Sequence, residues 1–185
     1  MKRAMRKGVT FAIISALVAL TALAASVPKA GEVAPALMLR DMTGKMVYLS
    51  DFCGRRCPMA NRRTTVVHFF ATHCKPCLKE IPAIKRLRNA FRKSDLAILI
   101  ISVADSKKAV IKYKQEKGLT AIFLLDKYGA NARRWGIFVK KGNSTSFSLP
   151  YTFLVSKDGI VRAALSGAHE NLDQLLVNKI RKMGK

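Results

Sequence analysis

The sequence predicts an α/β fold in which helices flank a central mixed β-sheet. Residues 66–70, 96–103 and 122–125 are short, mostly apolar runs without Asp, Glu, Lys or Arg. Such runs are typical of buried strands. Residues 75–92 carry apolar side chains at helical spacings opposite Lys and Arg, and residues 107–117 form a second predicted helix. Strands that alternate with helices predict a sheet covered by helices.

The remaining elements lie at the two ends of this alternating region. An N-terminal β-hairpin is expected to extend the sheet, with Gly44 in its turn. A second hairpin turns at Asp158-Gly159, and the segment before it, residues 138–148, is expected to be an inserted loop. The further elements expected are strands at 37–40, 46–49, 151–156 and 159–165, a turn with a short helix at 126–136, and a closing helix at 171–182.

Residues 1–25 are predicted to be a signal peptide or an N-terminal membrane anchor. Four cations lie within the first seven residues, and an apolar or small-residue run follows at residues 9–25, with 22–24 (ALA) as a cleavage triplet. The run of 17 residues is at the lower limit for spanning a bilayer, so an uncleaved anchor is the alternative. In either case residues 26–185, one domain, are expected in the bacterial periplasm, soluble or tethered to the inner membrane.

The exported part is strongly basic. Without the four leader cations, 30 Lys and Arg stand against 11 acidic residues, a net charge of +19. This charge is compatible with a solvated basic surface, an anionic membrane or an acidic protein partner. Nucleic acid is not expected, because the chain is exported and does not interleave aromatic with basic residues. We expect a monomer.

The cysteine spacing indicates two pairs outside the cytoplasm. Of the three possible pairings, the short spacings favour Cys53 with Cys57 and Cys74 with Cys77. Cys74-Lys75-Pro76-Cys77 lies where a buried strand meets a helix. Unpaired N–H groups and the helix dipole stabilise a thiolate there, and Lys75 adds a cation.

The geometry of the CKPC motif favours redox chemistry. Cys77 follows Cys74 by one turn, and Pro76 removes no intrahelical donor in a first turn. The alternatives are a structural staple or half of a zinc site, for which the sequence offers no clear second half.

Residues 66–82, VVHFFATHCKPCLKEIP, resemble the signature of the TlpA/ResA-like thiol–disulfide oxidoreductases, exported thioredoxin-fold proteins related to the AhpC/TSA redoxins. The resemblance continues through residues 34–51, 126–137 and 149–159. It implies a thioredoxin fold and a disulfide reductase that serves cytochrome c maturation or another envelope acceptor. It also implies protein disulfide or dithiol substrates, a membrane electron donor and no cofactor or metal.

Matched residue by residue, the resemblance makes Cys74 the attacking cysteine, Cys77 the resolving one and Pro150 the adjacent cis-proline. Glu80 matches the family's acidic residue in the first helix, although an acid interacting with the helix dipole is the simpler interpretation. Lys75 favours the reduced form, so catalysis in the oxidase direction is an alternative.

Two histidines depart from the family pattern. His73 replaces the usual Trp before the first cysteine, and His68 replaces a buried Asn or Asp in the strand. A histidine beside the thiols would assist proton transfer. The alternative for His68 is a core side chain that is hydrogen-bonded within the protein. With Lys75 and Pro76, these histidines are predicted to modulate the redox pair.

Cys53 and Cys57 have no counterpart in the family pattern and are expected to form a structural disulfide that closes a short basic loop. A second redox pair, a metal site with a histidine and free thiols are the alternatives. Their spacing also suggests a rival function, a copper-binding or metallochaperone module, although the pair precedes the central strand.

Overall fold

A computed structural model describes residues 26–141 and 144–183 of the chain. The predicted signal peptide or anchor, residues 1–25, lies outside the described residues. Within the described part, no helix is both long and apolar enough to cross a membrane.

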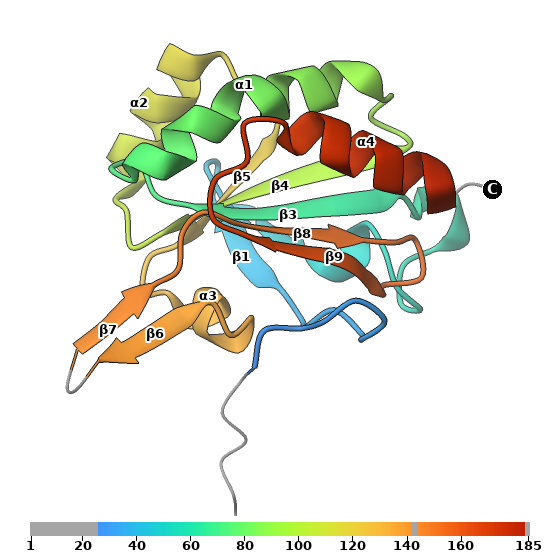
Figure 1. Ribbon diagram of the computed structural model, residues 1–185, viewed down its shortest axis with the longest axis horizontal. Coiled ribbons are helices and arrows are strands. Elements are labelled where there is room, and N and C mark those ends of the chain that lie inside the picture. The colour runs from blue at the N-terminus through green and yellow to red at the C-terminus, as the bar shows by residue number, and fades with distance from the viewer. Residues whose placement is uncertain (1–25, 142–143, 184–185) are drawn as a thin grey trace, which may run out of the picture.

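The core of the molecule is a seven-stranded mixed sheet with the order β2-β1-β5-β4-β3-β8-β9 (Figure 1). β3, β4 and β5 are parallel neighbours, whereas all other pairings in this sheet are antiparallel. The predicted N-terminal hairpin is present and joins the sheet through β5. The strands are β1 (Met38–Asp41), β2 (Met46–Tyr48), β3 (Thr64–Phe70), β4 (Leu96–Val103), β5 (Ile122–Asp126), β8 (Tyr151–Val155) and β9 (Val161–Ser166).

Three helices cover one face of the sheet, and a fourth, shorter helix lies on the other side (Figure 1). The covering helices are α1 (Lys75–Ala90), α2 (Lys107–Lys117) and α4 (Leu172–Met183), and the short one is α3 (Ala130–Arg134). Apolar residues of α1, α2 and α4 pack with one face of β3 and β4, while Trp135, after α3, packs with the other face. The predicted α/β class with a mixed sheet is confirmed.

β3 is the central strand that carries the chain to the CKPC motif. Every residue of β3 is buried, because β4 and β8 flank it and both faces are covered. Side chains alternate between the two faces. Val67 and Phe69 therefore lie in the α3-side core, whereas His68 faces the same side as Val66 and Phe70, toward α1 and α4.

Residues 138–148 form a β-hairpin and not the expected loop. β6 (Phe138–Lys141) pairs antiparallel with β7 (Ser144–Phe147) as a separate two-stranded sheet. The ring of Phe147 lies directly over Gly129, where an added Cβ would clash with it. The hairpin is thus held against the start of α3 by a contact between residues far apart in sequence.

Candidate active site

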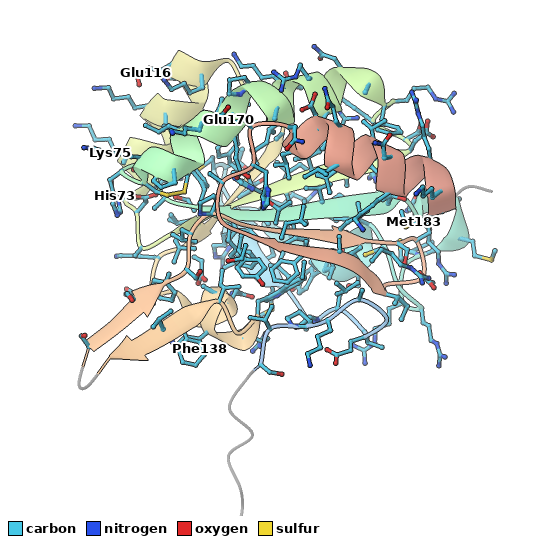
Figure 2. All side chains as sticks on the ribbon, in the orientation of Figure 1. His73, Lys75, Glu116, Phe138, Glu170 and Met183 are labelled. Atoms are coloured by element: carbon cyan, nitrogen blue, oxygen red, sulfur yellow. A yellow bond between two sulfur atoms is a disulfide. The ribbon has the colours of Figure 1, made fainter. Side chains whose placement is uncertain are left out.

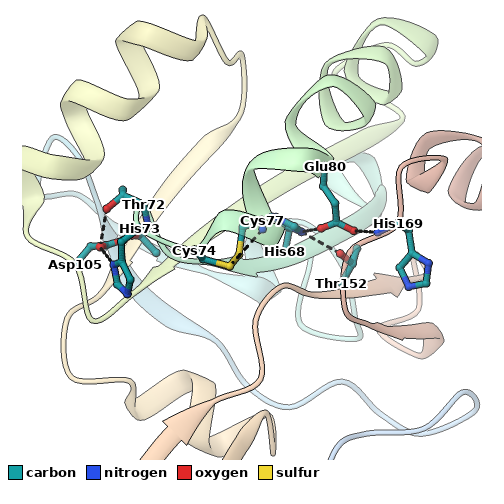
Figure 3. The surroundings of a disulfide bond; sticks show 10 residues. His68, Thr72, His73, Cys74, Cys77, Glu80, Asp105, Thr152 and His169 are labelled. Carbon is teal, nitrogen blue, oxygen red and sulfur yellow. Dashed lines mark hydrogen bonds and ion pairs between the residues drawn. A yellow bond between two sulfur atoms is a disulfide. The ribbon is translucent and has the colours of Figure 1, made fainter.

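Cys74 and Cys77 form a disulfide at the carboxyl end of β3, where α1 begins. The predicted pairing of these two cysteines is confirmed. Figure 3 shows the disulfide between two polar clusters, one around Asp105 and the other around Glu80. Figure 2 places this end of the molecule, labelled by His73 and Lys75, opposite the end that carries Met183.

The two sulfur atoms of the disulfide differ in exposure. Cys74 is the N-cap of α1, is partly exposed, and its Sγ accepts the N–H of Cys77 at 3.3 Å. Cys77 is completely buried. Lys75 and Pro76, the first residues of the helix, are exposed. A thiolate on Cys74 is therefore stabilised by a backbone donor, the helix dipole and a nearby cation.

Glu80 lies in the second turn of α1 and is completely buried. Its Oε1 accepts the backbone N–H of His169 at 2.9 Å, and burial raises the pKa of its carboxyl to about 7. The interpretation of Glu80 as an acid that only complements the helix dipole does not account for these observations. The dipole acts mainly within the first turn of a helix, and it would lower the pKa of the carboxyl, whereas burial raises it. The carboxyl is instead poised to gain or lose a proton near neutral pH behind the disulfide.

His68 is also completely buried and lies beside Glu80. Its Nδ1 is 2.9 Å from Thr152 Oγ1 and 3.8 Å from Glu80 Oε2. Burial lowers the pKa of the imidazole to about 4, so the ring is neutral at pH 7. The interpretation as a hydrogen-bonded core histidine is confirmed, and the structure adds a contact with a titratable carboxyl.

His73 is exposed and pairs with Asp105, whose carboxylate lies 3.4 Å from Nδ1. The buried Asp105 also accepts hydrogen bonds from the backbone and hydroxyl of Thr72, each at 2.8 Å, and from the hydroxyl of Ser102. This carboxylate therefore fastens the turn before Cys74 to the end of β4.

Asp105, Thr152 and His169 are among the residues of the surroundings that were not singled out in the sequence. The position of Asp105 in the sequence could have indicated its place beside the motif. It follows β4, a parallel neighbour of β3, and the carboxyl ends of parallel strands meet at one edge of a sheet. Thr152 had only its place in the resembling segment 149–159 after Pro150, and His169 had no signal, since it lies outside every matched segment.

The Leu149–Pro150 peptide bond is cis, as the resemblance implies. Pro150 is buried between β7 and β8. Leu149 packs against the same apolar cluster as Cys74. The part of Pro150 in substrate binding stays a prediction.

The predicted disulfide between Cys53 and Cys57 is absent, and both residues are buried free thiols. Cys53 Sγ lies 3.8 Å from the carbonyl of Leu49, and Cys57 Sγ lies 3.6 Å from that of Pro58, so each thiol donates to a backbone oxygen. Burial raises the pKa of Cys53 to about 11. Spacing alone favoured a bridge but did not account for the core that surrounds these thiols.

Within the described residues, no three His, Cys, Asp or Glu side chains form a group that would hold a metal ion. Cys53 and Cys57 therefore lack the further ligand that the copper-binding alternative needs, and no observation favours that function.

Comparisons with known proteins identify the family of the chain. The AhpC/TSA family model matches residues 30–164. Thiol-disulfide oxidoreductase ResA of Geobacillus thermodenitrificans is 28% identical over 137 residues, which cover 74% of this chain and 69% of that protein.

Solved structures share the fold at lower sequence identity. A putative thiol:disulfide interchange protein DsbE from Chlorobium tepidum has a TM-score of 0.68 at 21% identity, covering 85% of this chain and 98% of that one. The thioredoxin domain of a thiol-disulfide oxidoreductase from Bacteroides vulgatus has a TM-score of 0.63 at 23% identity, covering 82% and 97%. The predicted thioredoxin fold is confirmed. The family match spans most of the chain and includes the whole Cys74–Cys77 region, so the chain belongs to the AhpC/TSA family and is a thioredoxin-like thiol–disulfide oxidoreductase.

Proposed function

We propose that the protein reduces disulfides of exported proteins, with Cys74 as the nucleophile and Cys77 as the resolving cysteine. The observation that carries this assignment is the difference in exposure: Cys74 is partly open at a helix N-terminus, whereas Cys77 is buried behind it. Only Cys74 is placed to meet a substrate sulfur, and its thiolate is the better stabilised.

The reaction proceeds in two exchanges. The Cys74 thiolate attacks one sulfur of the substrate disulfide, that bond breaks, and a mixed disulfide forms while the first substrate thiolate leaves. Cys77 then loses its proton and attacks Cys74 Sγ, which releases the second substrate thiolate. The protein is left as the Cys74–Cys77 disulfide seen in the structure, and two electrons and two protons from a membrane donor restore the dithiol.

The thiol–disulfide activity is supported by relatives, the envelope location is inferred from the leader, and the reducing direction is inferred from the family resemblance of residues 66–82. Similar proteins are named thiol-disulfide oxidoreductase ResA and thiol:disulfide interchange protein DsbE. We propose an acceptor of the kind that cytochrome c maturation requires, reached in the periplasm by a chain that residues 1–25 export or anchor.

The charge around the disulfide favours an acidic substrate segment. Lys75 opens α1, and Lys107 and Lys108 open α2; all three are exposed, and neither first turn holds an acidic residue. Cations at a helix N-terminus oppose the dipole and are unfavourable in isolation. The carboxylates of Glu80 and Asp105 are buried and Glu170, after His169, is exposed, so the three lysines outnumber the exposed acid and attract anionic partners.

Two measurements test the proposal. The first is trapping of substrate: Cys77→Ser is expected to accumulate mixed disulfides through Cys74, and Cys74→Ser to abolish disulfide reduction. Faster alkylation of Cys77 than of Cys74 in the reduced protein at neutral pH would reverse the roles.

The second measurement is the equilibrium potential of the Cys74–Cys77 pair against glutathione. A value of about −270 mV, that of thioredoxin, supports the reducing direction, whereas one of about −120 mV identifies an oxidant.

A further inference from the structure

Two ionisable side chains, His68 and Glu80, lie fully buried against one another behind the disulfide (Figure 3). Their contact, Nδ1 to Oε2, measures 3.8 Å, too long for a hydrogen bond. Each group is only half paired: Glu80 Oε1 accepts from His169, and His68 Nδ1 bonds Thr152. In the described part of the chain, Glu80 Oε2 and His68 Nε2 have no hydrogen-bond partner. An unpaired buried polar atom costs free energy, so the pair calls for a functional explanation.

The hydrogen-bond pattern assigns the proton of the imidazole. A neutral ring carries one N–H, and the unpartnered ring atom is Nε2. A buried acceptor without a partner is tolerated better than a buried N–H without one. The proton of His68 therefore resides on Nδ1, and Nδ1–H donates to Thr152 Oγ1.

An ionised Glu80 needs a new donor. Burial of a carboxylate is unfavourable unless hydrogen bonds compensate it. The His169 N–H already serves Oε1, and Arg86, the cation between α1 and α4, is bound to Asp173 at 2.7 Å. The distance from His68 Nδ1 to Glu80 Oε2 is 3.8 Å, about 1 Å longer than a hydrogen bond, so a small movement of the ring would bring the two atoms into bonding distance.

The other polar groups of this region make no hydrogen bond to Glu80 Oε2 in the described part of the chain. Thr152 of β8 accepts from His68, and Tyr113 of α2, whose buried hydroxyl has no partner, packs its ring on Phe70 at 5.3 Å between centroids. On α1 itself Lys79 is exposed, whereas Cys77 is buried in the apolar cluster of α1, α2 and α4 and is the proton source of the proposed step. His68 is thus the group suited to respond when Glu80 ionises.

We propose that His68 is a positioning residue for the resolving step. When Glu80 ionises, the Nδ1–H of His68 stops donating to Thr152 Oγ1 and donates to Glu80 Oε2 instead. This hydrogen bond stabilises the carboxylate that accepts the proton of Cys77. The step balances: Glu80 takes the proton, the Cys77 thiolate bonds to Cys74 Sγ, and the bond from Cys74 to the substrate sulfur breaks. Once Glu80 is protonated, Nδ1–H returns to Thr152. This inference rests on the proposed function for its Cys77 step.

The central experiment compares two substitutions of His68 in the full-length chain. His68→Phe keeps the bulk of the ring and removes both nitrogens, whereas His68→Asn keeps an N–H donor at the position of Nδ1. Reduced protein is mixed with an aromatic disulfide, 5,5′-dithiobis(2-nitrobenzoate), and the second release of thionitrobenzoate reports resolution of the Cys74 mixed disulfide across the pH range. His68→Phe is expected to raise the midpoint of the pH–rate profile for this second release by about one pH unit, and to slow the release about tenfold at pH values below the midpoint. His68→Asn is expected to shift the same midpoint less.

A second measurement does not depend on any substrate. The carboxyl carbon shift of Glu80, followed by NMR in the reduced protein, is expected to titrate at higher pH in His68→Phe than in the wild type. Thr152→Val removes the resting acceptor and frees Nδ1–H, so it is expected to lower the Glu80 midpoint. These opposite shifts distinguish a transferable hydrogen bond from a general loss of packing.

Three results would overturn the inference: equal Glu80 midpoints in folded His68→Phe and wild type, equal midpoints in His68→Asn and His68→Phe, or a raised midpoint in Thr152→Val. If melting curves show that His68→Phe does not fold, the inference is tested by the Glu80 midpoint in Thr152→Val alone. Failure of the wild type to reduce protein disulfides would reject the proposed function, and the NMR titration would still report on His68.

Discussion

Cys74 and Cys53 are the same side chain in opposite environments. Cys74 caps α1, accepts a backbone N–H and lies beside Lys75, all of which stabilise a thiolate. Cys53 lies in the hydrophobic core, 2% exposed, where burial raises its pKa to about 11. One chain therefore holds a reactive thiol and an inert one, and local structure determines which is which.

This contrast predicts the thiol count of the oxidised protein. Denatured without reductant, the chain is expected to release two titratable thiols, Cys53 and Cys57, because the structure holds both as free thiols. In the folded protein both should resist alkylation, since they are buried and the Cys53 thiol stays protonated. Ellman titration before and after denaturation measures this. A count of zero after denaturation would restore the 53–57 disulfide.

At the scale of elements, the sequence predicted best where the pattern was strong. The β4 bounds 96–103 and the α2 bounds 107–117 agree with the structure, because an uncharged apolar run defines the strand, while Ser106 caps the helix and Gly118 ends it in a left-handed conformation. The β6–β7 hairpin was missed, since Ser144–Phe147 shows no apolar alternation and its anchor, Gly129, is distant in sequence.

The same division holds for the site. The sequence singled out Cys74, Cys77 and Glu80 as candidates because one segment that resembles the family signature contains them. It did not reveal that His68 and Glu80 meet, since this contact depends on how α1 packs over β3. Motifs within one element are readable from sequence, whereas contacts between elements require the fold.

The hairpin anchor makes a testable prediction. Phe147→Ala is expected to detach β6–β7 from Gly129, because its ring is the contact there, and to lower the free energy of unfolding by about 1–2 kcal/mol, less than a fully buried Phe would cost. Urea unfolding and hydrogen exchange of the hairpin amides measure these effects. Val139→Ala, at a 52% exposed position of β6, is the control and should change stability by less than about 0.5 kcal/mol. Equal effects of the two substitutions would reject the anchor.

At the scale of the whole molecule, the net charge of +19 on residues 26–185 is expected to act as a field on the approaching substrate. Replacing Lys107 and Lys108 by Gln is expected to lower kcat/KM several-fold for an acidic disulfide peptide and to weaken its salt dependence. The reason is that two cations are lost from the first turn of α2, which begins just after Asp105, the partner of His73. Initial rates at low and high ionic strength measure this.

The matched control removes the same charge at the other end of the molecule. Lys179 and Lys182 lie in α4, whose end at Met183 is opposite the disulfide (Figure 2). Replacing both by Gln should leave kcat/KM closer to wild type. If both double variants lose activity equally, the net charge rather than its position matters, and the acidic-substrate proposal loses its local basis.

The buried pair also couples the stability of the whole protein to pH, with opposite signs for its two members. Burial raises the Glu80 pKa from 4.5 to about 7, so between these values the folded state keeps a proton that the unfolded state has lost, and stability falls as pH rises. Burial lowers the His68 pKa from 6.5 to about 4. Between about pH 4 and 6.5 the imidazole is therefore protonated in the unfolded state but not in the folded state, and the stability of the protein rises with pH.

In the wild type these two pH dependences of stability oppose one another between about pH 4.5 and 6.5. Removing the Glu80 carboxyl should leave the contribution of His68, and removing the His68 imidazole should leave that of Glu80. For oxidised Glu80→Gln, the free energy of unfolding relative to wild type is expected to rise by about 1.4 kcal/mol per pH unit from about pH 4.5 to 7. For His68→Asn the difference should fall with pH from about pH 4 to 6.5. Urea unfolding at several pH values measures both, and the disulfide keeps Cys74 and Cys77 from titrating. A difference that does not vary with pH for Glu80→Gln would mean that the Glu80 carboxyl ionises as readily in the folded protein as in the unfolded chain, which its complete burial argues against.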